Sequence, residues 1–249
     1  MKLSWRLISF GFAAYLVFLV ATLPAGTVLA RMQSQGISAS GVSGSIWNGR
    51  AMLLRVGNTV LGETSWQMKF LPLFTGRASA DISIKRDAGS AHATISKGFG
   101  KRINITRLQG ALPIAALGGL GLPGGWSGDV RLQIAQLELE NSWPTQLVGD
   151  IEATNLVGPA NQPTALGNYR VEFPDATNTA NGITGTLTSS GEGPLDVKGT
   201  LRLLANRTYV IDAQVATRPS APESIAKALQ YLGPPDARGR RPLSMSGSL

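Results

Sequence analysis

Cysteine is absent from the 249 residues, and His92 is the single histidine. The first absence excludes disulfides, cysteine-ligated zinc or iron–sulfur sites, and thiol nucleophiles. The second excludes any site that needs two imidazoles, such as the paired histidines of a zinc helix. Charged residues make up only 15% of the chain and aromatic residues 6%. These absences make an ordinary hydrolase or metalloenzyme a poor match, and we expect no catalytic residue, no cofactor, no metal site and no enzymatic activity.

The few charges are predominantly positive, with 23 Lys and Arg against 15 Asp and Glu and a net charge of +8. The excess is dispersed in small clusters at Lys85-Arg86, Lys101-Arg102 and 238–241. Nucleic-acid-binding proteins usually gather basic residues on one face and interleave them with aromatic residues. We predict no nucleic acid partner and no small-molecule substrate, and the positive balance suits a location beside anionic lipid headgroups.

Residues 7–23 form an apolar run without a single charge. As a helix this run is about 26 Å long, close to the thickness of a bilayer core. Lys2 and Arg6 precede it, so the positive-inside rule places the N-terminus in the cytoplasm. The pattern predicts a short cytoplasmic end and a membrane anchor within residues 1–30, followed by a periplasmic domain over residues 31–249.

A cleaved signal peptide is the alternative, with the small residues of Val28-Leu29-Ala30 before the cleavage site. The apolar run is longer than the roughly 7–15 residues of a signal-peptide core, which favours the retained anchor. Both alternatives export residues 31–249. No second run approaches the length of a spanning helix, so we expect a single-pass protein of the inner membrane.

Glycine, at 30 residues, recurs before a small or acidic residue and an apolar residue that opens an alternating run. We predict that each such glycine makes a turn or bulge at the start of a strand. The motif occurs at Gly44-Ser45-Ile46, Gly128-Asp129-Val130, Gly149-Asp150-Ile151, Gly185-Thr186-Leu187, Gly199-Thr200-Leu201 and Gly247-Ser248-Leu249.

The alternating runs predict strands with one apolar face, and the short connections between them predict antiparallel neighbours. A one-residue shift in the pattern predicts a bulge near Ala135–Gln136. The tail is expected to form a last strand that ends at Leu249. The residues predicted on apolar faces include Leu132, Ile134, Ile151, Leu201, Leu203, Tyr209 and Ile211.

Two segments favour helix over strand. Residues 112–120 predict a short helical turn. Residues 220–233 predict a helix with a capping box of Ser220 and Glu223, Pro222 in its first turn, and an apolar stripe. The stripe consists of Ile225, Ala228, Leu229 and Leu232. One such helix cannot cover a large sheet, so we expect a mainly β fold: a curved antiparallel β-sheet, half-pipe or sandwich-like, with one or two short helices.

Several patterns resemble functional motifs but have a simpler interpretation. Glu138 and Glu140 lie two apart on a predicted strand, where a solvated face explains them better than a glycosidase pair. Asp150 and Glu152 are interpreted in the same way. His92 has no orienting group nearby in the sequence, so we interpret it as a surface or structural residue. Three glycines match a dinucleotide-binding fingerprint by letter, but the required strand–helix order is reversed: Gly119, Gly121 and Gly124.

Two tryptophans leave two interpretations open. Trp47 precedes Asn48-Gly49, a dipeptide typical of hairpin turns. Trp66 opens an apolar run of Met68, Phe70, Leu71, Leu73 and Phe74 that ends at Gly76. The run belongs either to the core, as large aromatic residues usually do, or to an exposed patch that contacts a partner or lipid.

Three ordered motifs and the anchor resemble protein N of the bacterial type II secretion system, the general secretion pathway protein N family. The first motif is Val42-Ser43-Gly44-Ser45-Ile46-Trp47-Asn48-Gly49-Arg50-Ala51. The second runs from Trp66 through Leu71-Pro72-Leu73-Phe74 to Gly76, and the third comprises Leu232-Gly233, Asp236, Gly239-Arg240, Leu243 and Gly247. These motifs are structural, and their order along nearly the whole chain carries the resemblance.

The resemblance implies a bitopic inner-membrane protein with a periplasmic β-rich domain. It implies an accessory, non-enzymatic role in the export of folded proteins across the outer membrane, with other type II secretion system subunits as partners. The alternative is an anchored envelope protein that binds or handles lipid in an apolar groove of the sheet.

Overall fold

The computed structural model describes residues 5–57, 59–86, 89–115, 125–159, 163–177, 182–191 and 193–248. The chain divides into two compact units, Met1–Arg86 and Asp87–Leu249. The predicted division between an anchor over 1–30 and a periplasmic domain over 31–249 concerns the membrane, and it stays a prediction.

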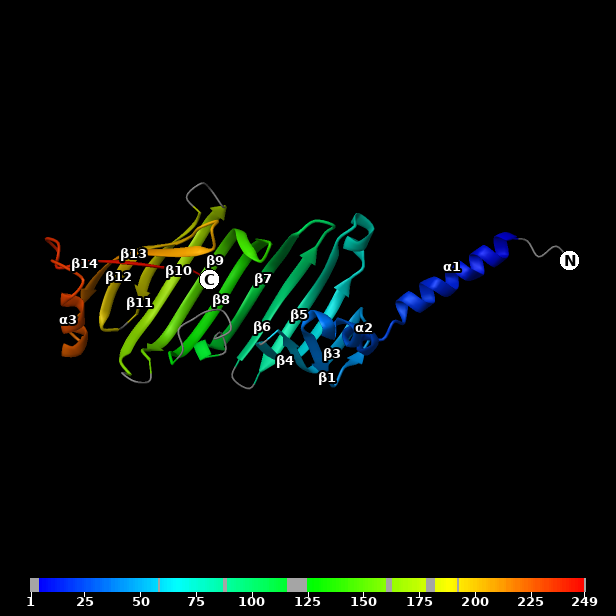
Figure 1. Ribbon diagram of the computed structural model, residues 1–249, viewed down its shortest axis with the longest axis horizontal. Helices are drawn as coiled ribbons and strands as arrows, with labels where there is room; N and C mark the ends of the chain where they lie inside the picture. Colours follow the sequence, from blue (N-terminus) through cyan, green and yellow to red (C-terminus); the bar gives the residue numbers. More distant parts are fainter. Residues whose placement is uncertain are drawn as a thin grey trace. The chain divides into compact units, whose positions relative to one another are not determined.

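The first unit begins with helices α1 (Trp5–Ala21) and α2 (Ala25–Arg31) and the short 3-10 helix η1 (Met32–Gln35). The sheet that follows is antiparallel in the order β1-β3-β4-β5, with β2 paired to β3 (Figure 1). A second 3-10 helix, η2 (Leu71–Thr75), connects β4 to β5. The strands are β1 (Ile37–Ser40), β2 (Ser43–Gly44), β3 (Asn48–Val56), β4 (Thr59–Lys69) and β5 (Ala78–Arg86).

Helix α1 carries apolar side chains around its whole circumference, and most of them are exposed. At 17 residues it is longer than the other described helices. Among the residues that the structure describes, no helix combines the length and the apolar character needed to cross a membrane.

The second unit is a meander in which each strand from β6 to β13 pairs antiparallel with the next, and β13 with β14. One α-helix, α3 (Glu223–Gln230), lies between the last two strands in the chain. The strands are β6 (Gly89–Lys97), β7 (Arg102–Pro113), β8 (Ser127–Glu140), β9 (Trp143–Val157), β10 (Ala165–Thr177), β11 (Ile183–Ser190), β12 (Leu195–Leu203), β13 (Thr208–Thr217) and β14 (Arg241–Ser248). The expected fold class, a mainly β antiparallel sheet with few helices, is confirmed.

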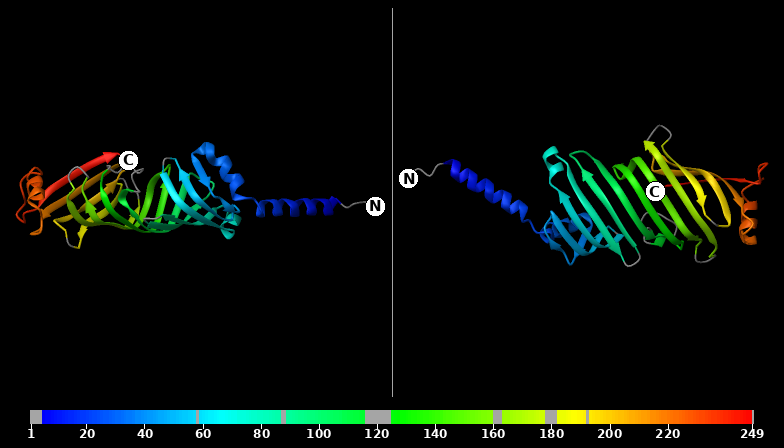
Figure 2. Two further views of the ribbon diagram at one scale, coloured as in Figure 1. Left: turned by 90° about the horizontal axis from the view of Figure 1, so that it is seen from below. Right: turned by 180° about the vertical axis from the view of Figure 1, so that it is seen from behind.

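The sheet of the second unit is strongly curved (Figure 2). Its main core cluster takes one residue each from β8, β9, β10 and β11, and Phe173 and Ile183 are 1% and 0% exposed. Leu108 of β7 and Leu203 of β12 pack against the same cluster. In a flat sheet those two strands would lie about 24 Å apart, so the shared cluster requires strong curvature.

A second cluster covers one end of this sheet, where Ile225 and Leu229 of α3 pack with Val197 of β12 and Val215 of β13. The predicted helix is therefore confirmed, but it is shorter than the expected 220–233. The predicted capping box is wrong, because Pro222 occupies the N-cap position and no side chain caps the helix. The apolar stripe is confirmed at Ile225 and Leu229, which are buried, whereas Ala228 is exposed.

The predicted alternation of apolar and polar residues between the two strand faces is confirmed. Cross-strand pairs place Leu132 opposite Ile151 and Leu201 opposite Ile211, on the apolar face as expected. The predicted bulge is confirmed by a register shift between Ile134 and Gln136. The predicted last strand is β14. The short helical turn predicted over residues 112–120 is wrong at Leu112 and Pro113, which belong to β7. Residues 116–120 lie outside the described residues.

The interpretation of the glycines as strand openers is wrong at most positions. Gly128 does lie at the start of β8, but Gly149 and Gly199 lie inside β9 and β12. Asn48-Gly49 opens β3 instead of making the turn, which falls on Ser45–Trp47. The reason is close packing between strands, since a Cβ atom at Gly149 or Gly199 would collide with the neighbouring backbone.

Three glycines accommodate an aromatic ring from the next strand. Trp66 packs on Gly49, Phe173 on Gly185 and Tyr209 on Gly247. A Cβ atom at Gly185 would lie 2.5 Å from Cε1 of Phe173, and one at Gly247 would lie 2.7 Å from Cε1 of Tyr209. Glycine at these positions gives each ring a place against the sheet, a known device for fixing strand register.

We predict that Gly185→Ala lowers the free energy of unfolding by about 1–3 kcal/mol, because the added methyl group overpacks the Phe173 ring. Gly100→Ala is the matched control, since the nearest atom to its Cβ would be the Arg102 nitrogen at 4.0 Å. Urea unfolding of the purified variants measures both effects, and Phe173→Leu in the Gly185→Ala background should restore part of the loss. Equal unfolding midpoints for the two single variants would contradict this account.

Candidate functional site

The outer face of the second unit carries a ladder of charges across β8, β9 and β10. Glu152, whose side chain is 13% exposed, lies 3.4 Å from Nη1 of Arg131 and 3.4 Å from Nη2 of Arg170. Both arginines are its direct cross-strand partners, and the Ser190 hydroxyl of β11 donates a third bond at 3.4 Å. A carboxylate surrounded in this way stabilises the pairing of β9 with its neighbours, and both of its oxygens contact a donor.

Glu138 and Glu140 share one partner, as two residues on the same strand face can. The Arg102 guanidinium lies 3.2 Å from Oε1 of Glu138 and 3.4 Å from Oε2 of Glu140. One arginine thus engages both carboxylates across the β7–β8 pair, and the interpretation of the two residues as a surface feature stays a prediction.

The other sequence patterns do not converge on a site. His92 is exposed on β6, opposite Gln109 of β7. Within the described ranges, no group of three or more His, Asp or Glu side chains is arranged to hold a metal ion. The glycine fingerprint of Gly119, Gly121 and Gly124 lies outside the described residues.

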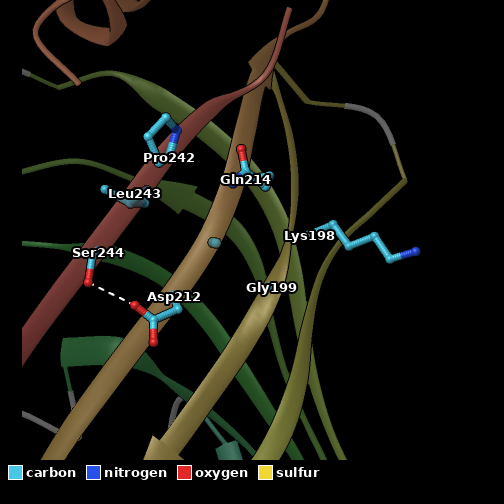
Figure 3. Close-up of a pocket in the computed structure, with 8 residues that line it drawn as sticks. Lys198, Gly199, Asp212, Gln214, Pro242, Leu243 and Ser244 are labelled. Carbon is cyan, nitrogen blue, oxygen red and sulfur yellow. Dashed lines mark hydrogen bonds between the residues drawn. The ribbon is translucent and has the colours of Figure 1, made fainter. Parts of the chain in front are cut away.

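A shallow pocket of about 310 Å³ lies on β12, β13 and β14 (Figure 3). Asp212 is its acidic group: Oδ1 accepts a 2.8 Å bond from the Ser244 hydroxyl, and Oδ2 accepts a 2.6 Å bond from Arg202. Figure 3 shows the Lys198 side chain directed away from Asp212. The pocket is lined by Lys198, Gly199, Asp212, Ala213, Gln214, Pro242, Leu243 and Ser244.

The hydrogen bonds from Ser244 and Arg202 hold the pKa of the Asp212 carboxyl below its ordinary value. The carboxylate is thus stabilised as an anion with both oxygens in use, which suits a structural clasp between strands and not a general base. Sequence reasoning missed this pocket because it depends on β14 returning to β13 after α3. The only sequence signal is the polar alternation of Lys198, Arg202, Asp212 and Gln214.

Trp47 and Trp66 lie at the β2–β3 turn of the first unit. The Trp47 indole N–H donates a 2.9 Å bond to the Val20 carbonyl of α1, and its ring stacks on Phe70 with centroids 5.0 Å apart. Trp66 donates through its indole N–H to the Ile46 carbonyl at 3.1 Å. Both rings are half-buried, which agrees with the core interpretation only in part.

The apolar run after Trp66 fits the other interpretation. Phe70, Leu71 and Phe74 are exposed, although they belong to a run as apolar as a core strand. The reason is that Pro72 and the left-handed Gly76 fold the segment into η2, which turns its side chains outward instead of along the sheet. This exposed apolar segment, and not a pocket, is the distinctive surface of the first unit.

Comparison with known proteins gives one consistent family. Residues 35–244 match the family described as "Type II secretion system (T2SS), protein N". A protein of Aeromonas hydrophila named type II secretion system protein N is 25% identical over 255 residues, covering 95% of each chain. Its namesake in Vibrio cholerae serotype O1 is 24% identical over 244 residues, covering 92% of each chain. No solved structure gives a significant match.

We predict that Ser244→Ala raises the pKa of Asp212 toward its ordinary value, because the variant loses the largest contribution that lowers it. A lowered folded-state pKa contributes stability that is present above the unfolded pKa and lost as pH falls through the folded value. The Ser244→Ala variant should therefore be less stable than the wild type above about pH 4 and equally stable well below it. Carboxyl NMR titration measures the shift. Ser246→Ala, on the same face of β14, is the control, and an unchanged Asp212 titration in Ser244→Ala would contradict the assignment.

Proposed function

The chain belongs to the type II secretion system protein N family, and we propose from this that it is an accessory, non-enzymatic component of that system. Its role is then in the export of folded proteins from the periplasm across the outer membrane. The single observation that carries the proposal is the family match over residues 35–244, which covers most of both compact units. The partners we propose are other subunits of the secretion system.

We also propose that α1 is a retained single-pass anchor in the inner membrane. Its apolar side chains are exposed all round, and no charge follows Arg6 until Arg31. Helix α1 has 17 residues and measures about 26 Å. The positive-inside rule, applied to Lys2 and Arg6, favours a cytoplasmic start for this helix. Residues 31–249 then lie in the periplasm, where the secretion system collects its folded substrates.

A non-enzymatic role is supported by the engagement of the acidic side chains that sequence reasoning singled out. Glu138, Glu140 and Glu152 all lie in ion pairs with arginines. The lipid-handling alternative has weaker support, because the apolar face of the second unit is filled by its own side chains. Phe173 and Ile183 at the centre of that face are buried against Ile134 and Leu147.

Deletion of the gene should cause folded exoproteins to accumulate in the periplasm, because the accessory component assists their passage out. Fractionation and activity assays of the exoproteins measure this, and resident periplasmic enzymes serve as the control. Complementation with the Glu138→Gln, Glu140→Gln double variant should restore secretion as well as the wild type does. Normal secretion of every exoprotein after clean deletion would count decisively against the proposal.

The proposed topology predicts that a periplasm-dependent reporter fused after Leu249 is active. The same reporter inserted before Lys2, with the anchor following it, should be inactive. Intact-mass measurement of the membrane-extracted protein should show residues 7–23 retained. A mature chain that begins at Arg31 would remove the anchor from the proposal while leaving the periplasmic location intact.

A further inference from the structure

The segment around η2 exposes an unusually dense set of apolar side chains. Four of the five residues from Phe70 to Phe74 are large and apolar, and Leu71 and Phe74 are 82% and 89% exposed. Single exposed apolar residues are normal on a protein surface, but a contiguous group marks a contact with a partner or a membrane. We call Phe70, Leu71, Leu73 and Phe74 the η2 apolar surface.

This surface is joined to the end of α1 through Trp47. The Trp47 ring stacks on Phe70, and its indole N–H donates to the Val20 carbonyl in the last turn of α1. The neighbouring Ile46 amide donates a 3.1 Å bond to the carbonyl of Leu23. The η2 apolar surface therefore begins one side chain away from the point where the apolar helix ends.

The charges around this surface complement a membrane. Residues 70–76 carry no charge, and they lie between Lys69 and Arg77. Lys69 pairs with Asp81 at 2.9 Å, which leaves the exposed Arg77 beside the apolar residues. A tryptophan at the interface level and basic residues flanking an apolar segment are typical of chain that lies in the headgroup region of an anionic bilayer.

We propose that the η2 apolar surface inserts into the headgroup–acyl boundary of the same bilayer that holds α1. Trp47 then lies at the interface and Arg77 faces anionic headgroups. The inference rests on the proposed function only through the assignment of α1 as the anchor. Its consequence is that the first unit contacts the membrane at two places, so it cannot rotate freely about α1.

The absence of cysteine allows a direct test with single labels. Phe74→Cys and Leu71→Cys, each coupled to the fluorophore NBD, are made in the full chain and reconstituted into vesicles of phosphatidylethanolamine and phosphatidylglycerol. Both side chains are exposed, so neither substitution removes core packing. We expect the NBD emission to shift to the blue on reconstitution. We also expect nitroxide-labelled lipid in the vesicles to quench this emission.

Val56→Cys is the matched control, an exposed apolar residue at the opposite end of the β3–β4 hairpin. It pairs with Thr59, ten residues from Lys69, which places it about 33 Å from η2. Its label should keep aqueous emission and escape quenching. Quenching of Val56→Cys to the same extent as Phe74→Cys would overturn the proposal, because contact would not be specific to η2.

A label at Tyr15→Cys in α1 separates this inference from the proposed anchor. If the Tyr15→Cys label is quenched by lipid and both η2 labels stay aqueous, the inference is overturned and the anchor stands. If the Tyr15→Cys label is itself aqueous, the proposed anchor is wrong and the inference fails with it. Quenching at Tyr15→Cys, Leu71→Cys and Phe74→Cys, with Val56→Cys aqueous, supports both.

Discussion

The structure of the second unit depends on one constraint: its sheet has a continuous apolar face and a helix too small to cover it. Helix α3 has eight residues and packs only on Val197, Val215 and their neighbours. The remaining apolar side chains leave water by packing on one another across strands, which requires the sheet to curve. Gly149 and Gly199 permit a close approach to the neighbouring backbone, and Gly185 leaves room for the Phe173 ring. The outer face grows wider as the inner one narrows, and cross-strand ion pairs such as Arg131–Glu152–Arg170 line it.

The faces of the strands and their antiparallel pairing could be predicted from the sequence, because alternation with a period of two residues is a local property of each run. The sequence also located the bulge at Ile134–Gln136 and the buried side of α3. The positions of the turns are predicted wrongly at Asn48-Gly49 and Gly149, because glycine occurs both in turns and at tight contacts between strands. Which of the two applies depends on the partner strand, as for Gly49 under Trp66. The capping box failed for a similar reason, since Pro222 takes the N-cap and leaves Ser220 outside the helix.

The polar contacts also depend on residues that lie far apart in the chain. Glu152 meets Ser190, 38 residues away, and Asp212 meets Ser244, 32 residues away. Neither contact has a local signature, so the pocket at β12–β14 could not be predicted from motifs. Once paired, these carboxylates have their oxygens occupied by arginine and serine donors. These donors tie each carboxylate to a neighbouring strand, which stabilises strand pairing.

The first unit differs from the second in that it leaves a group of large apolar side chains exposed. Its sheet buries Ala51 completely but the rings of Trp47 and Trp66 only in part, and η2 turns Leu71 and Phe74 outward. The last carbonyls of an α-helix lack partners within the helix. In α1 the Val20 carbonyl accepts the Trp47 indole N–H, and Leu23 just beyond the helix accepts the amide of Ile46. The β2–β3 turn is thereby bonded to the end of α1, and Phe70 is stacked on that turn. Apolar side chains held so close to an apolar helix share its environment, so whatever solvates the end of α1 also solvates η2.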